Sequence, residues 1–158
     1  MSEWQRFAEL LDTEDRLLGA VEKAALDLTQ ALVSNSPAQI DGAERRLEAQ
    51  RLLHTAAYRA RMTMQKNGFG ELTLSQVCAY APGPLRRQLG GTARTIATRA
   101  IALKMTVANN RALIVAGLER LAKTVAVLQR AGTERTGTYK RRGIIPPPTG
   151  SVLVSRRA

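Results

Sequence analysis

A long row of apolar side chains at helical spacing, between residues 84 and 130, constrains the fold of this chain most strongly. Successive members lie three or four residues apart, the spacing that places side chains along one face of an α-helix. The row contains Leu89, Ala93, Ile96, Ala100, Leu103, Val107, Asn110, Ile114, Leu118, Leu121, Val125 and Leu128, and only Asn110 is polar. The pattern therefore predicts one amphipathic helix that is roughly 70 Å long.

Two further segments show the same periodicity. Residues 2–33 carry a row with Glu14 at one position, and residues 37–66 carry a second row whose register changes near Gln50. Ser36, with Pro37 and Gln39 after it, is predicted to cap the second helix. The first row is Phe7, Leu11, Leu18, Val21, Ala25, Leu28 and Leu32, and the second is Ile40, Ala43, Leu47, Leu53, Ala57, Ala60 and Met64.

The connections between these segments carry turn signals. Asn67-Gly68-Phe69-Gly70 is expected to end the second helix, with a glycine in the left-handed conformation. A short helix capped by Thr73 is predicted for residues 74–80, and Pro82-Gly83-Pro84 interrupts the chain again. Gly90-Gly91 is the weakest point of the last helix.

These elements predict an all-α fold. We expect an elongated antiparallel bundle of three long helices, with one short helix between the second and the third. Residues 1–131 would form this bundle, and residues 132–158 would form a flexible basic tail because their pattern cannot bury a core. The last helix is longer than its two partners, so part of its apolar row is expected to lack an internal cover.

Composition excludes several function classes. The chain has one Cys (Cys78) and one His (His54), so it can form neither an intrachain disulfide nor a zinc site built from Cys and His. No apolar run reaches the roughly 18 residues that a membrane span requires, and the acidic N-terminus does not resemble a signal peptide. We expect a cytoplasmic protein without a cofactor, a metal or an enzymatic activity.

Charge is unevenly distributed along the chain. Residues 1–66 contain 9 basic and 10 acidic side chains, whereas residues 67–158 contain 15 basic and 3 acidic ones. A positive field of this kind attracts nucleic acid, an acidic membrane face or an acidic protein. A solvated helix face also explains basic residues that lie off the apolar row, and these are Arg86, Arg87, Arg94, Arg99, Lys104, Arg111, Arg120, Lys123 and Arg130.

Several single residues have two interpretations. Asn110 either fixes the register of a helical seam or contacts a bound peptide. The row from Ile114 to Leu128 is either core or a binding groove. His54 is expected to be a solvated or partly packed helix residue, and Cys78 a small buried one. A seam with one Asn suits a homodimer as well as an intramolecular bundle.

The C-terminal half resembles a known family. Asn109-Asn110-Arg111-Ala-Leu113-Ile114 leads through Leu118, Leu121 and Leu128 to Tyr139-Lys-Arg-Arg-Gly143. This looks like the ending of the FlgN-type flagellar export chaperones, which have a long last helix with Asn and then a tail with a Tyr-x-x-x-Gly segment. The acidic helical start and the short Leu72–Val77 element also fit that layout.

The resemblance implies a non-enzymatic chaperone of flagellar type III export. Such chaperones bind the C-terminal segments of hook–filament junction proteins, prevent their premature assembly and deliver them to the export gate. On the family pattern, Tyr139 is the candidate gate contact, with an incidental tail aromatic as the alternative. The candidate cargo contacts are Asn110, Leu113, Ile114, Leu118, Leu121, Val125 and Leu128.

The alternative function is a basic helical module that binds nucleic acid or an acidic partner surface. Its basis is the charge of residues 67–158. No RNA-stacking motif or recognition-helix pattern accompanies this charge, so nucleic acid is the less favoured partner.

Overall fold

The computed structural model describes the backbone of residues 2–141 and the side chains of residues 2–132. The described chain is helical and contains no β-strand. Its elements are α1 (Glu3–Ser34), α2 (Pro37–Phe69), the short α3 (Leu74–Tyr80) and α4 (Gly83–Arg141). The all-α prediction is confirmed.

Helix α1 begins with a capping box that satisfies two backbone donors. The Ser2 hydroxyl accepts a hydrogen bond from the Gln5 backbone, and the Gln5 side chain accepts one from the Ser2 backbone. Its buried face follows the predicted row closely and consists of Phe7, Ala8, Leu11, Glu14, Leu18, Val21, Ala24, Ala25, Leu28 and Ala31. Burial of a Phe or Leu side chain contributes roughly 1.5–3 kcal/mol, so this face is a main source of stability.

Helix α2 follows after a tight connection, in which Asn35 adopts the left-handed conformation with φ 52°. Pro37 begins the helix, as predicted. Ser36 occupies the predicted N-cap position, but its side chain makes no capping hydrogen bond, so the predicted capping pattern is wrong in that part. The Gln39 side chain instead accepts a hydrogen bond from the Ser34 hydroxyl, so it is not available for a capping box.

The predicted register change near Gln50 of α2 is also wrong. Leu53, predicted to pack, is 53% exposed, and Ala60 is exposed as well. The less exposed positions include one row that continues the spacing of the first half without a break: Ile40, Ala43, Leu47, Gln50, His54, Ala57, Arg61 and Met64. The periodicity was obscured because three of these positions carry polar side chains.

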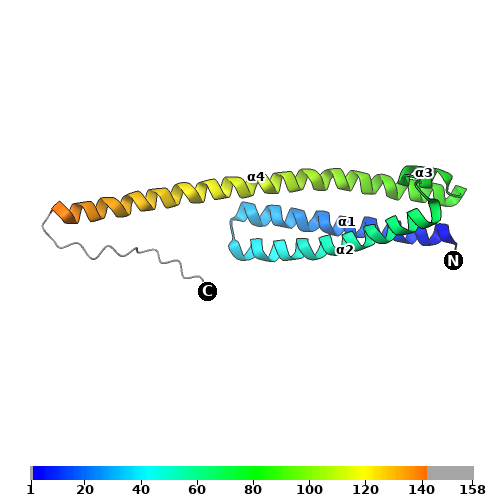
Figure 1. Cartoon of the computed structure of the whole chain (residues 1–158), viewed down its shortest axis with the longest axis horizontal. Coiled ribbons are helices and arrows are strands. Elements are labelled where there is room, and N and C mark those ends of the chain that lie inside the picture. Colours follow the sequence, from blue (N-terminus) through cyan, green and yellow to red (C-terminus); the bar gives the residue numbers. More distant parts are fainter. Residues whose placement is uncertain (1, 142–158) are drawn as a thin grey trace. The chain divides into compact units, whose positions relative to one another are not determined.

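Helices α1 and α2 lie side by side and run in opposite directions (Figure 1). At one end the ring of Phe69 contacts those of Trp4 and Phe7, with centroid distances of 4.5 and 5.2 Å. At the other end Leu28 and Ala31 of α1 pack with Ala43 of α2. Contacts between the start of one helix and the end of the other are those of an antiparallel pair.

The short helix α3 closes one end of this core. Gly70 ends α2 as predicted and has a positive φ of 67°, but its ψ of −140° lies outside the expected left-handed helical conformation. Thr73 caps α3 as predicted and forms a capping box with Gln76. Val77 and Cys78 are buried in the same cluster as Phe7, Leu11 and Leu89 of α4. The predicted buried state of Cys78 is therefore confirmed.

Helix α4 contributes residues to two compact units. Unit 1 is Met1–Ile114 and unit 2 is Val115–Ala158. Within unit 1, α4 contacts α1 through Gln88 and Thr92, which donate to Asp12, and further along through Asn110. Residue numbers rise together in these contacts, so this part of α4 runs parallel to α1.

Helix α4 ends at Arg141, beyond the predicted boundary between residues 131 and 132. Once a helix exists, each added residue gains a backbone hydrogen bond without a new nucleation cost, so weak helix formers can prolong it. Residues 142–158, which belong to the predicted tail, lie outside the described residues. Within the range searched, no helix combines the length and the apolar character that a membrane span requires.

Candidate functional site

The main candidate site is a row of exposed apolar residues in unit 2. We call Leu118, Leu121, Val125 and Leu128 the distal row; their side chains are 42–65% exposed. Their spacing of three and four residues places them along one side of α4. Among the described side chains of unit 2, every apolar one is exposed except Ala116, which is partly buried. Because these side chains are exposed, the structure does not support the interpretation of this row as core.

Leu113 and Ile114, which the resemblance assigns to the same site, belong to unit 1. Their side chains are 37% and 39% exposed. These values are close to that of Val125 in the distal row, which is 42% exposed. Both residues retain apolar surface that a partner can contact.

Asn110 is buried in unit 1 and does not present its amide to a partner. It is 5% exposed, and its Nδ2 donates to the Ala25 carbonyl oxygen at 3.0 Å. Its Oδ1 accepts a hydrogen bond from the Thr29 hydroxyl at 2.7 Å. These bonds fit the register-fixing interpretation, and we leave Asn110 out of the proposed cargo surface.

Arg99 is one basic residue of α4 that the solvated-face interpretation does not describe. Its Nη1 donates to Glu22 at 3.2 Å, and its Nε lies 3.1 Å from Asp15 Oδ1, as an ion pair without hydrogen-bond geometry. The guanidinium lies across Gly19, where an added Cβ would be 2.7 Å from Nη1. A glycine on α1 between two acidic residues, Asp15 and Glu22, is the sequence signal that points to this contact.

The sequence also did not predict a buried ion pair between α1 and α2. Arg61 donates to both carboxylate oxygens of Glu14, at 2.7 and 3.2 Å, and both side chains are almost fully buried. Arg61 also donates to Gln65, whose amide donates to the Leu72 carbonyl oxygen at 2.6 Å. The network ties α1, α2 and the segment before α3 together, so its role is structural.

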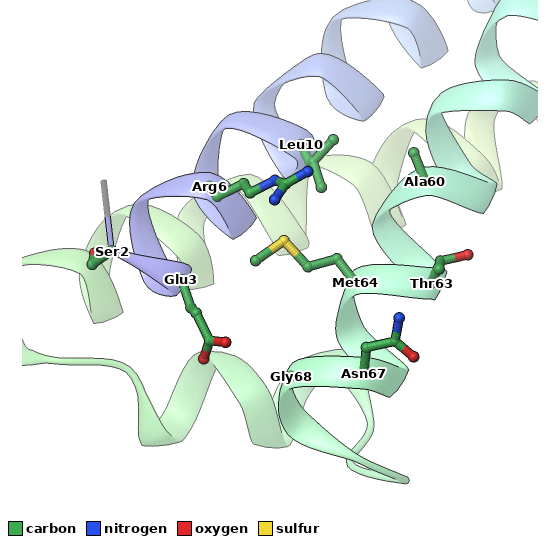
Figure 2. Close-up of a pocket in the computed structure, with 9 residues that line it drawn as sticks. All are labelled: Ser2, Glu3, Arg6, Leu10, Ala60, Thr63, Met64, Asn67 and Gly68. Carbon is green, nitrogen blue, oxygen red and sulfur yellow. The ribbon is translucent and has the colours of Figure 1, made fainter.

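A hollow of about 420 Å³ lies between the start of α1 and the end of α2 in unit 1. Figure 2 shows Arg6 of α1 and Met64 of α2 extending across it, with Glu3 at one side. In the described part of the chain, no group of three His, Cys, Asp or Glu side chains is placed to hold a metal ion. The Ser2 hydroxyl that lines the hollow accepts the hydrogen bond of the α1 capping box from the Gln5 backbone.

The remaining residues that the sequence singled out are His54, Cys78 and Tyr139. His54 is partly buried on the α1-facing side of α2, in agreement with a packed helix residue. Burial raises the pKa of the Cys78 thiol, which keeps it protonated at neutral pH. Tyr139 lies in the backbone range of α4, but its side chain is outside the described ones, so the gate contact stays a prediction.

The chain was also compared with known proteins. No family model, curated protein or solved structure matched it.

Proposed function

We propose that this chain is a cytoplasmic chaperone of flagellar type III export, which binds the C-terminal segments of hook–filament junction proteins. The distal row is the observation that carries the proposal. A helix that exposes Leu118, Leu121 and Leu128 in water is typical of a surface that binds a partner. An amphipathic cargo helix would cover this row in the manner of helix-in-groove recognition.

The architecture supports this proposal. We infer that α1, α2 and α4 form the antiparallel arrangement of three long helices that the resemblance implies. Helix α1 packs against α2 along its length, and Asp12, Ala25 and Thr29 of α1 bond to α4 within unit 1. The buried apolar residues therefore lie in unit 1, whereas the distal row in unit 2 is exposed and can contact a partner.

A charge in the distal row tests the cargo site. We expect Leu118→Asp to weaken binding of a junction-protein C-terminal segment at least tenfold, because an unpaired carboxylate would enter an apolar interface. Ala126→Asp is the matched control, because Ala126 is also exposed on α4 but lies neither three nor four residues from any member of the row. Titration calorimetry of the full chain at low and physiological salt measures both variants, and circular dichroism verifies their helicity.

Two outcomes would contradict the cargo proposal. If Leu118→Asp unfolds the protein, the row is core under solution conditions. If wild type ignores the peptide but binds a nucleic-acid duplex with a steep salt dependence, the chain is the basic module. Apolar cargo binding is expected to depend much less on salt.

The second part of the proposal is delivery to the export gate by Tyr139. We expect Tyr139→Ala to leave cargo affinity unchanged and to reduce secretion of the junction proteins in cells. Calorimetry measures the first quantity, and immunoblotting of culture supernatants measures the second. Loss of cargo affinity in this variant would contradict the assignment of cargo and gate to different residues.

A further inference from the structure

A second surface with distinct chemistry lies in unit 1, between α3 and the first turns of α4. It is an open groove of about 690 Å³. Leu74 and Cys78 of α3 and Ala93 and Ala97 of α4 give it an apolar lining. Gly90 also lines it, and a Cβ added there would meet nothing within 4 Å, so the groove is open beside this residue.

Three arginines line the same groove. Arg86, Arg87 and Arg94 are all exposed. Two of them are held by the backbone, since Arg86 Nε donates to the Ala81 carbonyl oxygen and Arg94 Nε donates to that of Gly90, each at 3.2 Å. These bonds fix the base of each guanidinium and leave its terminal amino groups for a ligand.

No described carboxylate neutralises these arginines, since the ion pairs between described residues involve other cations. Asp12, the α1 carboxylate that reaches this part of α4, accepts from Gln88 and Thr92, which do not line the groove. The groove therefore combines a small apolar floor with three unneutralised guanidinium groups.

We propose that the α3/α4 groove is a docking site for an acidic amphipathic helix of a partner protein. Leucine-sized side chains of such a helix would cover the floor between Leu74 and Ala93, and its Asp or Glu side chains would pair with Arg86, Arg87 and Arg94. Arginine suits this role because its planar fork binds carboxylates through two hydrogen bonds.

Charge and lining disfavour other occupants. Residues 142–158 of this chain contain three arginines and no Asp or Glu, so like charge opposes their docking here. Single-stranded nucleic acid is bound through aromatic stacking platforms, and no aromatic side chain lines this groove. The site is separate from the distal row, so it does not depend on the chaperone proposal.

Fluorescence anisotropy with a labelled synthetic helix tests the groove. The probe carries Leu at positions i, i+3, i+4 and i+7 and Glu on the remaining surface, and it is titrated with the full-length protein at physiological salt. We expect saturable binding that Arg94→Glu weakens at least tenfold, because like charge replaces a carboxylate partner. Arg111→Glu is the matched control, since Arg111 is exposed on the same helix but does not line the groove.

The apolar half of the site has its own variant. Ala97→Trp fills the groove at an exposed position, so we expect loss of binding with unchanged helicity. A probe with Ser in place of Leu and a probe with Gln in place of Glu should both bind at least tenfold more weakly. Leu118→Asp should bind the intact probe like wild type, which separates this site from the cargo site.

Several results would overturn the proposal. Equal losses in Arg94→Glu and Arg111→Glu would mean that the general positive field attracts the probe. Unchanged binding in Ala97→Trp would place the probe elsewhere. Preference of the groove for a DNA duplex or for anionic phospholipid vesicles, with the same sensitivity to Arg94→Glu, would assign it to another class of partner.

Discussion

Leu89 and Leu118 lie on the same helix, α4, and carry the same side chain, but their surroundings differ. Leu89 in unit 1 is fully buried with Phe7, Leu11 and Val77. Leu118 in unit 2 is 61% exposed. Periodicity identifies the apolar side of a helix, but a second element has to supply the cover. The same sequence pattern is therefore packed into a core in unit 1 and exposed in unit 2.

The two units also differ in what stabilises their helices. In unit 1, buried apolar contacts and the Glu14–Arg61 pair hold the helices together. In unit 2, the described side chains of α4 are almost all exposed, so its helicity depends on backbone hydrogen bonds and intrinsic propensity. Ala, Leu and Arg make up half of residues 115–132 and are strong helix formers. A bound partner would add the packing that unit 2 does not have.

Among the variants that test this difference between the units, Glu14→Ala is expected to lower the free energy of unfolding most. The substitution leaves Arg61 buried without its carboxylate, which costs about 3–5 kcal/mol. We expect a corresponding fall in the free energy of unfolding of unit 1, measured by urea denaturation followed by circular dichroism.

Two further variants control this experiment. Glu9→Ala removes an exposed acidic residue from the same helix and should change stability by less than about 0.5 kcal/mol. The double variant Glu14→Leu with Arg61→Met should recover much of the loss, because packed apolar residues can replace a buried ion pair. Equal stability of Glu14→Ala and wild type would contradict the structural role of the network.

A smaller effect on stability is expected when Leu89 and Leu118 of α4 are each replaced by alanine. Leu89→Ala should destabilise by roughly 2–5 kcal/mol, because it leaves a cavity in the cluster with Phe7 and Val77. Leu118→Ala should change the free energy of unfolding by less than about 0.5 kcal/mol, but it should weaken cargo binding. Similar stability losses in both variants would contradict the difference between the units.

Most of the fold was predictable because the apolar spacing of α1 and α4 is regular. The Thr73 capping box, the positive φ at Gly70 and the buried position of Glu14 all follow from local patterns. The packed side of α2 was not predictable in its second half. Gln50, His54 and Arg61 occupy the less exposed positions there, and only the partner helix with Glu14 explains why a buried Arg is tolerated.

The candidate site was predictable only as a set of residues. Spacing identified Leu118, Leu121, Val125 and Leu128, but whether they are covered depends on elements far away in the sequence. The same limit applies to Asn110 and Arg99, whose partners Ala25, Thr29 and Glu22 lie about 80 positions earlier in the chain. The α3/α4 groove depends on two helices meeting around Gly90, which no local pattern indicates.

The smallest effect comes from two glycines of α4, one in each unit. A Cβ added at Gly91 or at Gly117 meets nothing within 4 Å, so alanine fits at both positions. Gly91→Ala should stabilise unit 1 by about 0.5–1 kcal/mol, because alanine has the higher helix propensity. Gly117→Ala should slow amide hydrogen exchange in unit 2 without moving the urea midpoint, because that segment is expected to fray independently of the packed core. An equal rise of the midpoint in both variants would show that the two units unfold together, and the exposed row would then belong to one cooperative structure.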